Sequence, residues 1–399
     1  MTQVQVVVVG GGVMGAATAW SLARRGTDVL LLERFEPGHH EGASHGATRN
    51  FNTAYSSDHY LDLVLRARDL WAELATEAAM PVLDPVGLVN HGGGLAGTAR
   101  WQAVRDALVA RGEHAEWLAA DAAHERWPAL RFRAAPVGDG RDVLWVPSGA
   151  RVRAADALAA MHDGVTRHGG AVRFSSRARA VEPLPEGGVR VVTDSDEVTC
   201  AVVVLTVGAW TAGLVASSGL DLPLPTLEVT QEQPAHFAVV RPDLLTGDLP
   251  GFNHAPDPDD PADAYFRSDV YGMHTPGEGI KAGWHGTGAV LDPDERTYAY
   301  EERQMADLRR YAADWLPAAD PDRFEAISCT YTSTASTDFV LDRRGDVVVG
   351  AGFSGHGYKF APAVGEVLAD LALGVGPGPA AAFRLTGRAE AGARRGYGT

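Results

Sequence analysis

The first 33 residues contain the pattern that most constrains the fold of this chain. Residues 4–9 (VQVVVV) form a β-branched run, which predicts a strand buried on both faces of a parallel sheet. A glycine triplet follows at once with the spacing G-x-G-x-x-G: Gly10, Gly12 and Gly15. Residues 16–25 then carry the apolar face of a helix, and residues 27–33 read as a second strand that ends in Glu33. This order predicts an α/β fold.

Each glycine of the triplet has a physical task in such a unit. Gly10 allows the tight turn, Gly12 lets the backbone approach a pyrophosphate, and Gly15 permits close packing of the helix. A phosphate rests at the helix N-terminus, and Glu33 can accept hydrogen bonds from ribose hydroxyls. Because strand, triplet, helix, strand and acid occur in order, the segment predicts dinucleotide binding rather than a purely structural turn. The motif alone does not distinguish NAD from FAD.

The segment after Glu33 favours the longer cofactor. Residues 37–49 (PGHHEGASHGATR) are polar, with too little apolar content for the next strand of a nicotinamide-binding half. We expect a loop that lies along FAD.

Composition excludes several other classes of protein. A chain of 399 residues with 45% apolar content has a real core and predicts two domains or one large domain. A formal charge of −16, with no basic patch, argues against nucleic-acid and membrane partners. The chain has no signal-like start and no apolar run near the ~20 residues of a membrane span, so we expect a cytoplasmic protein. Its two cysteines, Cys200 and Cys329, fit a reducing compartment.

Only two of the 35 basic residues are lysines, namely Lys281 and Lys359. An ammonium is a compact charge on a flexible stem, which a planar guanidinium does not replace. A lysine retained among arginines therefore hints at specific chemistry, although chance survival on the surface is the simpler alternative. Both lysines lie in Gly-rich, aromatic surroundings, GIKAGWH and GFSGHGYKF.

Several short stretches together carry a resemblance over nearly the whole chain. They are GGGVMG, SHGATR, LWAEL, ERWPAL, VGAW, GIKAGWH, CTYT and GFSGHGYKF, in this order. In them the chain resembles the monomeric sarcosine oxidase and N-methyltryptophan oxidase family of flavoproteins, within the D-amino acid oxidase superfamily. The resemblance implies a Rossmann-like FAD-binding domain and an antiparallel-sheet substrate domain. We expect the first over 1–83, 150–226 and 330–399, and the second over 84–149 and 227–329.

The resemblance implies that Cys329 is joined through sulfur to the 8α-methyl of the flavin. A thiolate can add to an electrophilic form of that ring, whereas the alternative is a buried core thiol, as we expect for Cys200. Lys281 matches the lysine beside flavin N5 that promotes reaction with oxygen. A buried cation lowers the cost of forming superoxide where water is excluded.

The remaining site residues also follow from the resemblance. Arg49 matches an arginine over the flavin and His285 its companion in the active site. Tyr271 and Tyr331 match tyrosines near the substrate, with packing as their alternative role. Further cofactor contacts are expected from Ser44, His45, Thr48, Gly355, His356, Gly357 and Lys359.

Residues 350–359 precede a clear helical pattern at 364–373. Such a loop presents N–H groups and a positive helix end to an anion, which the resemblance identifies as the N1 and C2 oxygen edge of the reduced flavin. Lys359 also matches a substrate-facing position. The alternative is an ordinary turn before a helix. No metal site is predicted.

The chain departs from the family pattern at Asn52. The family commonly clamps a substrate carboxylate between a lysine and an arginine, and Asn52 stands where that arginine is expected. An amide has two neutral donors where the guanidinium has five charged ones, so a few kcal/mol of binding is at stake. This puts plain sarcosine in doubt and favours a larger secondary amine, a cyclic imino acid or a modified amino acid.

The resulting prediction is an FAD-dependent oxidase that converts a secondary amine or amino acid to an imine and reduces oxygen to hydrogen peroxide. Alternatives are an amine dehydrogenase or tailoring enzyme with a modified substrate, a noncatalytic flavin-binding subunit, and a plain nicotinamide dehydrogenase. A monomer or a homodimer is expected. Helices are predicted over 60–75, 154–168 and 301–313, and disorder over the last dozen residues.

Overall fold

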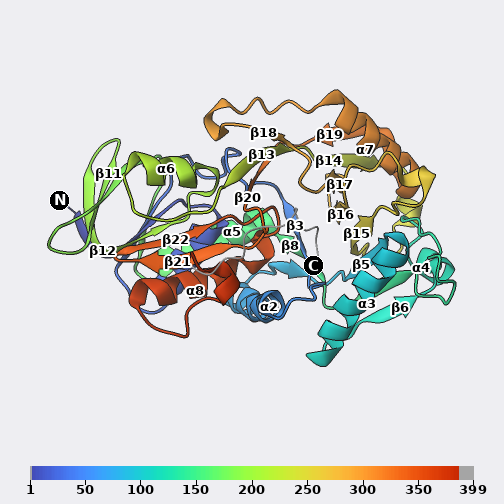
Figure 1. Ribbon diagram of the computed structural model, residues 1–399, viewed down its shortest axis with the longest axis horizontal. Coiled ribbons are helices and arrows are strands. Elements are labelled where there is room, and N and C mark those ends of the chain that lie inside the picture. Colours follow the sequence, from blue (N-terminus) through green and yellow to red (C-terminus); the bar gives the residue numbers. More distant parts are fainter. Residues whose placement is uncertain (1, 386–399) are drawn as a thin grey trace.

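A computed structural model describes residues 2–385. It contains two large sheets, one in each half of the molecule, and two three-stranded sheets between them (Figure 1). The mixed α/β fold agrees with the prediction. The predicted disorder of the last dozen residues lies outside the described residues. Within residues 2–385, no helix has the length and apolar character that crossing a membrane requires.

The first large sheet has eight strands, in the order β10-β11-β12-β1-β2-β9, with β22 beside β12 and β21 beside β22. Strand β12 is long enough to pair with β11 along its first half and with β22 along its second half. The central neighbours of β1 are parallel to it. The strands are β1 (Thr2–Val9), β2 (Val29–Leu32), β9 (Ala171–Arg173), β10 (Ala178–Pro183), β11 (Val189–Thr193), β12 (Glu197–Leu205), β21 (Val340–Arg344) and β22 (Val347–Ala351).

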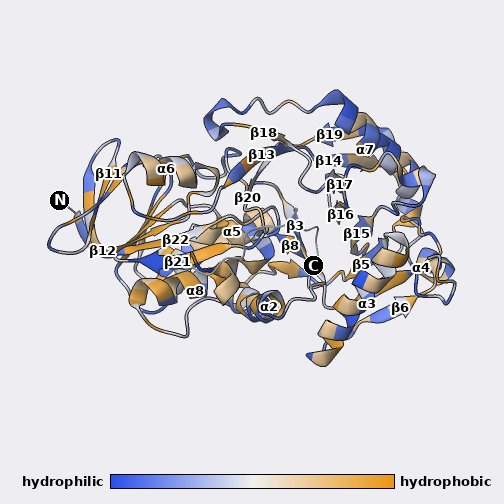
Figure 2. Cartoon of the chain, in the orientation of Figure 1, coloured by the Kyte–Doolittle hydropathy of each residue, from blue (hydrophilic) through white to orange (hydrophobic). Residues whose placement is uncertain are grey.

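Strand β1 is buried on both faces because alternate side chains enter two different cores. Val6 and Val8 pack with the helices on one face, whereas Val7 and Val9 pack on the other face, where α6 (Thr211–Ser217) contributes Val215. Figure 2 shows the strands of this sheet as predominantly hydrophobic. The helices of the first face are α1 (Val13–Ala23), α2 (Asp58–Ala78), α5 (Ala154–Arg167) and α8 (Ala361–Leu373).

The predicted elements of the N-terminal unit are present, although α1 begins at Val13, earlier than expected. Gly15 lies inside its first turn, where an added Cβ would meet the Gly10 carbonyl oxygen at 1.8 Å. Gly10 itself has φ +98°, which favours glycine. The three helices expected from periodicity are α2, α5 and α7 (Glu302–Trp315), with ends that differ by up to three residues.

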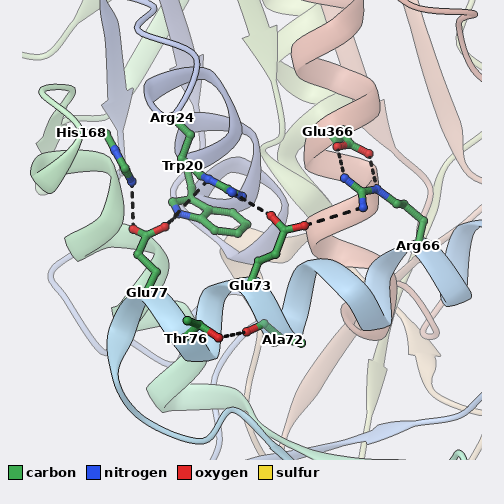
Figure 3. Close-up of polar contacts among 9 residues, drawn as sticks. All are labelled: Trp20, Arg24, Arg66, Ala72, Glu73, Thr76, Glu77, His168 and Glu366. Atoms are coloured by element: carbon green, nitrogen blue, oxygen red, sulfur yellow. Dashed lines mark hydrogen bonds and ion pairs between the residues drawn. The ribbon is translucent and has the colours of Figure 1, made fainter.

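A polar contact network joins the helices on this face (Figure 3). Glu77 of α2 accepts a hydrogen bond from the indole N–H of the buried Trp20 of α1 at 3.1 Å. Glu77 also contacts Arg167 of α5 at 2.8 Å and His168 at 3.0 Å. One carboxylate therefore links three helices.

The second large sheet has the order β19-β14-β17-β16-β15-β5-β7-β6 and is antiparallel except for the β15–β5 pair. Helix α7 covers one of its faces, and α3 (Gly94–Ala110) and α4 (Ala120–Arg126) lie near β5 and β6 (Figure 1). The strands are β5 (Leu88–Gly92), β6 (Glu116–Leu118), β7 (Val143–Val146), β14 (Ala235–Val239), β15 (Gly251–Ala255), β16 (Val270–Thr275), β17 (Gly279–Trp284) and β19 (Ala319–Ala326).

Strand β17 shows how this sheet separates its two faces. Ile280, Ala282 and Trp284 pack in the apolar core beneath α7. Lys281 lies between them in sequence and therefore projects from the opposite face, because successive side chains of a strand alternate. That opposite face lines a cavity.

The small sheets connect the two halves. One comprises β3 (Thr48–Phe51), β4 (Leu83–Asp84) and β8 (Ala150–Arg153), and the other β13 (Glu228–Glu232), β18 (Ala289–Val290) and β20 (Cys329–Ser333). The predicted loop over 37–49 therefore ends in a strand, because Thr48 and Arg49 pair with β8.

All strands of the first large sheet fall in the predicted cofactor ranges and all those of the second in the predicted substrate ranges. The exact domain boundaries stay a prediction.

Candidate active site

A single cavity of about 1560 Å³ runs from the N-terminal glycine turn to the polar face of the second sheet. Its wall includes the glycine turn, the loop after β2, strand β20 and the loop before α8. Most of the residues predicted to form the site line it: Gly10, Gly12, Glu33, Ser44, His45, Arg49, Asn52, Tyr271, Lys281, Cys329, Tyr331, Gly355, His356, Gly357 and Lys359.

Three predicted residues do not line this cavity. Gly15 lies within α1 and serves its packing. Thr48 is buried behind the wall, where its hydroxyl lies 2.7 Å from that of Thr275. His285 is not among the lining residues, but its ring centroid lies 5.3 Å from that of Tyr331, which lines the cavity. His285 can therefore support Tyr331.

Buried polar groups surround the glycine turn. The Glu33 carboxylate accepts hydrogen bonds from the Gly11 N–H at 2.7 Å and the Phe35 N–H at 2.9 Å. A carboxylate has about four acceptor positions, so Glu33 retains capacity for a ligand hydroxyl. Ser44 accepts from the Val13 N–H at 3.0 Å, which holds the loop after β2 against the first turn of α1.

Arg49 organises the loop that precedes it. Its guanidinium donates to the carbonyl oxygens of Ala43, His45 and Thr48 and lies 5.5 Å from the centre of the Tyr358 ring. Burial, assisted by the charge of Arg49, lowers the pKa of His45 to about 3, so that imidazole is neutral.

The Cys329 thiol lies in the cavity wall at the first position of β20, partly exposed and 4.0 Å from the Ala43 carbonyl oxygen. Cys200 differs completely, because it is buried in the core of the first sheet and burial raises its pKa to about 11. Only Cys329 has the access to the cavity that reaction with a bound ligand requires.

Lys281 is the central cation of the sheet face. Its side chain is buried, and burial with the nearby charge of Arg49 lowers its pKa to about 7, whereas Cys329 and Glu278 act to raise it. In the antiparallel register Lys281 pairs with Met273 on one side and His236 on the other. Paired residues share a face, so the three side chains lie in one row along the cavity.

The second lysine belongs to a hydrogen-bonded chain in the loop before α8. Lys359 Nζ donates to the Tyr55 hydroxyl at 2.9 Å and to the His356 carbonyl at 2.7 Å. The Tyr55 hydroxyl lies 3.1 Å from His356 Nδ1, and His356 Nε2 lies 3.2 Å from the Thr337 carbonyl. That carbonyl fixes the proton on Nε2, so Tyr55 donates to Nδ1. Burial lowers the pKa of Lys359 to about 7.

Close packing shapes the wall between the two lysines. An added Cβ at Gly355 would lie 2.1 Å from the Tyr331 ring, so the loop before α8 reaches that ring only as glycine. Asn52 is buried, and its Oδ1 accepts from the Ala54 N–H at 2.7 Å. Its amide group Nδ2 remains the polar group that Asn52 can present to a ligand. Burial raises the pKa of Tyr271, which therefore stays a neutral phenol.

Sequence reasoning missed four polar residues of this site: Tyr55, His236, Asn253 and Glu278. Asn253 donates to Asn90 at 2.8 Å within the second sheet. No motif marks these positions, because each is a single polar residue in a strand, loop or turn. Tyr55, three residues after Asn52, was the one that proximity to a quoted motif could have indicated.

The fold and the cavity together define a dinucleotide-binding α/β protein whose cavity reaches the polar face of a second sheet. The sequence matches the family of FAD dependent oxidoreductases over residues 5–371, and the chain belongs to that family. This confirms the predicted resemblance and the class of enzyme.

Individual relatives cover almost the whole chain. The peroxisomal sarcosine oxidase of Homo sapiens is 30% identical over 95% of each protein. The monomeric sarcosine oxidase of Bacillus sp. (strain B-0618) is 29% identical over 93% of each. Among solved structures, the open form of NikD, an unusual amino acid oxidase essential for nikkomycin biosynthesis, superposes with a TM-score of 0.79 at 27% identity, covering 94% of each chain.

The residues present fit FAD. The glycine turn and Glu33 suit the adenosine end of a dinucleotide. The cavity continues past the Cys329 thiol to Lys281 and the loop before α8, which provides the length that a flavin requires. The buried groups Lys281 and His236 lie where a polar ring system can meet them.

Proposed function

We propose that this protein is an FAD-dependent oxidase that converts the carbon–nitrogen bond of a secondary amine or amino acid, N-methyl or cyclic, to an imine and reduces oxygen to hydrogen peroxide. The balance is complete, because the substrate loses two electrons and two protons and oxygen gains them. The observation that carries the proposal is Lys281, a buried cation on the polar face of the second sheet, in the same cavity as Cys329 and the glycine turn.

When bound, FAD accepts hydride from the substrate carbon and passes electrons to oxygen. Glu33, Ser44 and the glycine turn hold its adenosine and phosphate portion, and Arg49 keeps the adjoining loop in place. Lys281 supplies positive charge where oxygen is reduced, in a site where low dielectric makes one charge effective. Tyr271 and Tyr331 wall the substrate, and His285 supports Tyr331 from behind.

Lys359 is the cation available to a substrate carboxylate. Asn52 adds neutral donors only, so a carboxylate meets one charged partner and not two. We therefore propose a substrate other than plain sarcosine, such as a cyclic imino acid or a modified amino acid. Asn253, a buried amide that lines the cavity, supports a substrate with an additional polar substituent.

The test is anaerobic bleaching of the flavin by a panel of N-methyl and cyclic amino acids and amines. We expect at least one of them to reduce the flavin, and oxygen to restore its colour with release of peroxide. Lys281→Met is expected to slow reoxidation by more than about 100-fold while reduction changes little, since removal of one preorganised charge costs about 3 kcal/mol. Normal reoxidation in Lys281→Met would remove the oxygen-activating role of Lys281, whereas slow reoxidation of the wild-type flavin by oxygen would favour another electron acceptor and a dehydrogenase.

We also propose that Cys329 carries the flavin covalently. The Cys329 sulfur would bond to the 8α-methyl carbon as the thiol and the methyl group each lose one proton, and the two electrons released would pass through the flavin to oxygen, which takes up the two protons as hydrogen peroxide. Acid precipitation is expected to leave the yellow colour with wild-type protein and to release it from Cys329→Ser. Cys200→Ser is the matched control, because Cys200 is buried away from the cavity. Colour in the wild-type supernatant would contradict the covalent link.

A further inference from the structure

His236 is a buried histidine on β14 whose two nitrogens have unequal surroundings. Its side chain is 7% exposed. Nδ1 lies 3.1 Å from Oε2 of Glu278, which follows β16 in the turn to β17. Nε2 is fully buried and has no hydrogen-bond partner among residues 2–385. The ring also lines the cavity.

The contact with Glu278 decides which nitrogen carries the proton. A carboxylate accepts, so Nδ1 bears the hydrogen and Nε2 presents a lone pair. The ring stays neutral because burial, with the charges of Lys281 and Arg49, lowers the pKa of His236 to about 3. A buried acceptor without a donor is costly, which indicates that a donor belongs beside Nε2.

The candidate donor that the sheet register places beside His236 is Lys281. Its Cα pairs with that of His236 in the antiparallel register between β14 and β17, so both side chains project from the same face of the sheet. No hydrogen bond or ion pair joins the Lys281 ammonium to the rest of the described chain. An acceptor that lacks a donor and a donor that lacks an acceptor therefore stand side by side.

We propose that His236, aligned by Glu278, is a positioning residue that accepts a hydrogen bond from the Lys281 ammonium, directly or through one water, and holds that charge toward the cavity. The consequence for oxygen reduction rests on the proposed function, whereas the contact does not. The other ionisable groups that face Lys281 are Arg49, His45, Cys329 and Glu278. Among these groups, Arg49 and Glu278 are charged, and His236 provides the neutral acceptor.

Because the chain contains only two lysines, NMR can measure the contact between His236 and Lys281. In holoprotein labelled with ¹³C and ¹⁵N in lysine side chains, NMR should show two ammonium signals, assigned with Lys281→Met. We expect His236→Leu to lower the pKa of Lys281 by about one unit, the tenfold effect of losing one hydrogen bond. The Lys359 signal should not move and serves as the internal reference, because Lys359 has its own partners, the Tyr55 hydroxyl and the His356 carbonyl.

Two further variants separate the contact from general disturbance. His236→Gln retains an acceptor and should recover part of the Lys281 shift. Glu278→Gln removes the carboxylate that orients the ring, at a side chain 40% exposed, so this variant should fold even if His236→Leu does not. Glu325→Gln is the control, because Glu325 also pairs with His236 in register but forms no hydrogen bond or ion pair with its ring within residues 2–385. It should leave the Lys281 titration unchanged.

The rates of flavin reduction and reoxidation then test whether the contact between His236 and Lys281 affects oxygen reduction. His236→Leu should slow flavin reoxidation several-fold, leave anaerobic reduction unchanged, and add nothing in the Lys281→Met background. An unchanged Lys281 titration in both His236→Leu and Glu278→Gln overturns the inference. If Lys281→Met reoxidises normally while His236→Leu still shifts the Lys281 signal, the proposed role of Lys281 in oxygen reduction fails and the contact stands.

Discussion

At the scale of single residues, the two lysines of the site differ in the polar groups that surround them. Lys359 donates to Tyr55 and to the backbone of its own loop, so part of its donor capacity serves the protein. Asn52 uses its oxygen on the Ala54 N–H. A substrate carboxylate would thus meet a partly occupied ammonium and a neutral amide, which makes binding of a minimal substrate weak.

Asn52→Arg tests this reasoning. We expect the variant to gain affinity for small N-methyl amino acids such as sarcosine by about tenfold or more, because a charged donor adds about 1.5–3 kcal/mol to a hydrogen bond. Flavin bleaching at varied sarcosine concentration measures the dissociation constant. Asn52→Gln, which keeps a neutral amide, is the control and should gain nothing. Equal behaviour of the two variants would contradict the role assigned to charge at this position.

The affinity of Lys359 for a carboxylate ligand should change with pH in a defined direction. Burial lowers the pKa of Lys359 to about 7, so its charged fraction falls as pH rises through neutrality. A carboxylate ligand therefore binds more weakly above that pH.

At the scale of elements, helices α1, α2 and α5 cover the first sheet as a unit. Their mutual contacts are mostly apolar, yet Trp20 also donates from a buried indole N–H to Glu77 (Figure 3). Gly164 of α5 completes the contact, since an added Cβ there would lie 2.6 Å from the Trp20 ring. The helical layer thus depends on one carboxylate and one glycine around a single indole.

Glu77→Ala should destabilise the protein by about 1–3 kcal/mol, because it leaves a buried N–H without its acceptor. Thermal unfolding of the holoprotein measures the effect. Glu73→Ala is the matched control on the same helix, since Glu73 contacts Arg24 and Arg66 near the surface. Such pairs contribute at most about 1 kcal/mol. A larger loss in the control would assign the stability to the surface ion pairs.

At the scale of the whole molecule, charge is distributed unevenly. The chain carries a net charge of −16, yet Arg49, Lys281 and Lys359 converge on one cavity. Their fields are least screened there, so the cavity can attract an anionic group that the outer surface repels. Burial also lowers the pKa of four histidines to about 3: His45, His91, His236 and His285.

Those histidines predict acid sensitivity. In the unfolded chain each takes up a proton near pH 6.5, whereas the folded protein keeps it neutral down to about pH 3. The unfolded state therefore binds more protons in this window, and stability falls as pH falls from 6.5 towards 3. The melting temperature should drop accordingly. His91→Gln should make the drop shallower, whereas His114→Gln, at a side chain 66% exposed, should not.

Local pattern determined much of this fold. The strand β1, the glycine turn and α1 were predictable because their spacing reports burial and backbone conformation directly. Periodicity likewise predicted α2, α5 and α7 to within three residues at each end. The strand β3 was missed in part, because its pairing with β8 depends on residues far along the chain.

The site residues divide in the same way into those that a local pattern indicated and those that only tertiary structure brought together. Sequence alone predicted that a dinucleotide unit lies in the N-terminal part of the chain, showed that two lysines stand apart from the arginines, and gave the expectation that Asn52 stands where the resemblance implies an arginine. Only the tertiary structure decided that His285 packs near Tyr331 and that His236 and Glu278 adjoin Lys281. The physical reason is that a strand's local pattern reports which face is buried, whereas its neighbours are chosen by long-range pairing. His236 and Lys281 meet through the register of β14 and β17, which no local pattern encodes.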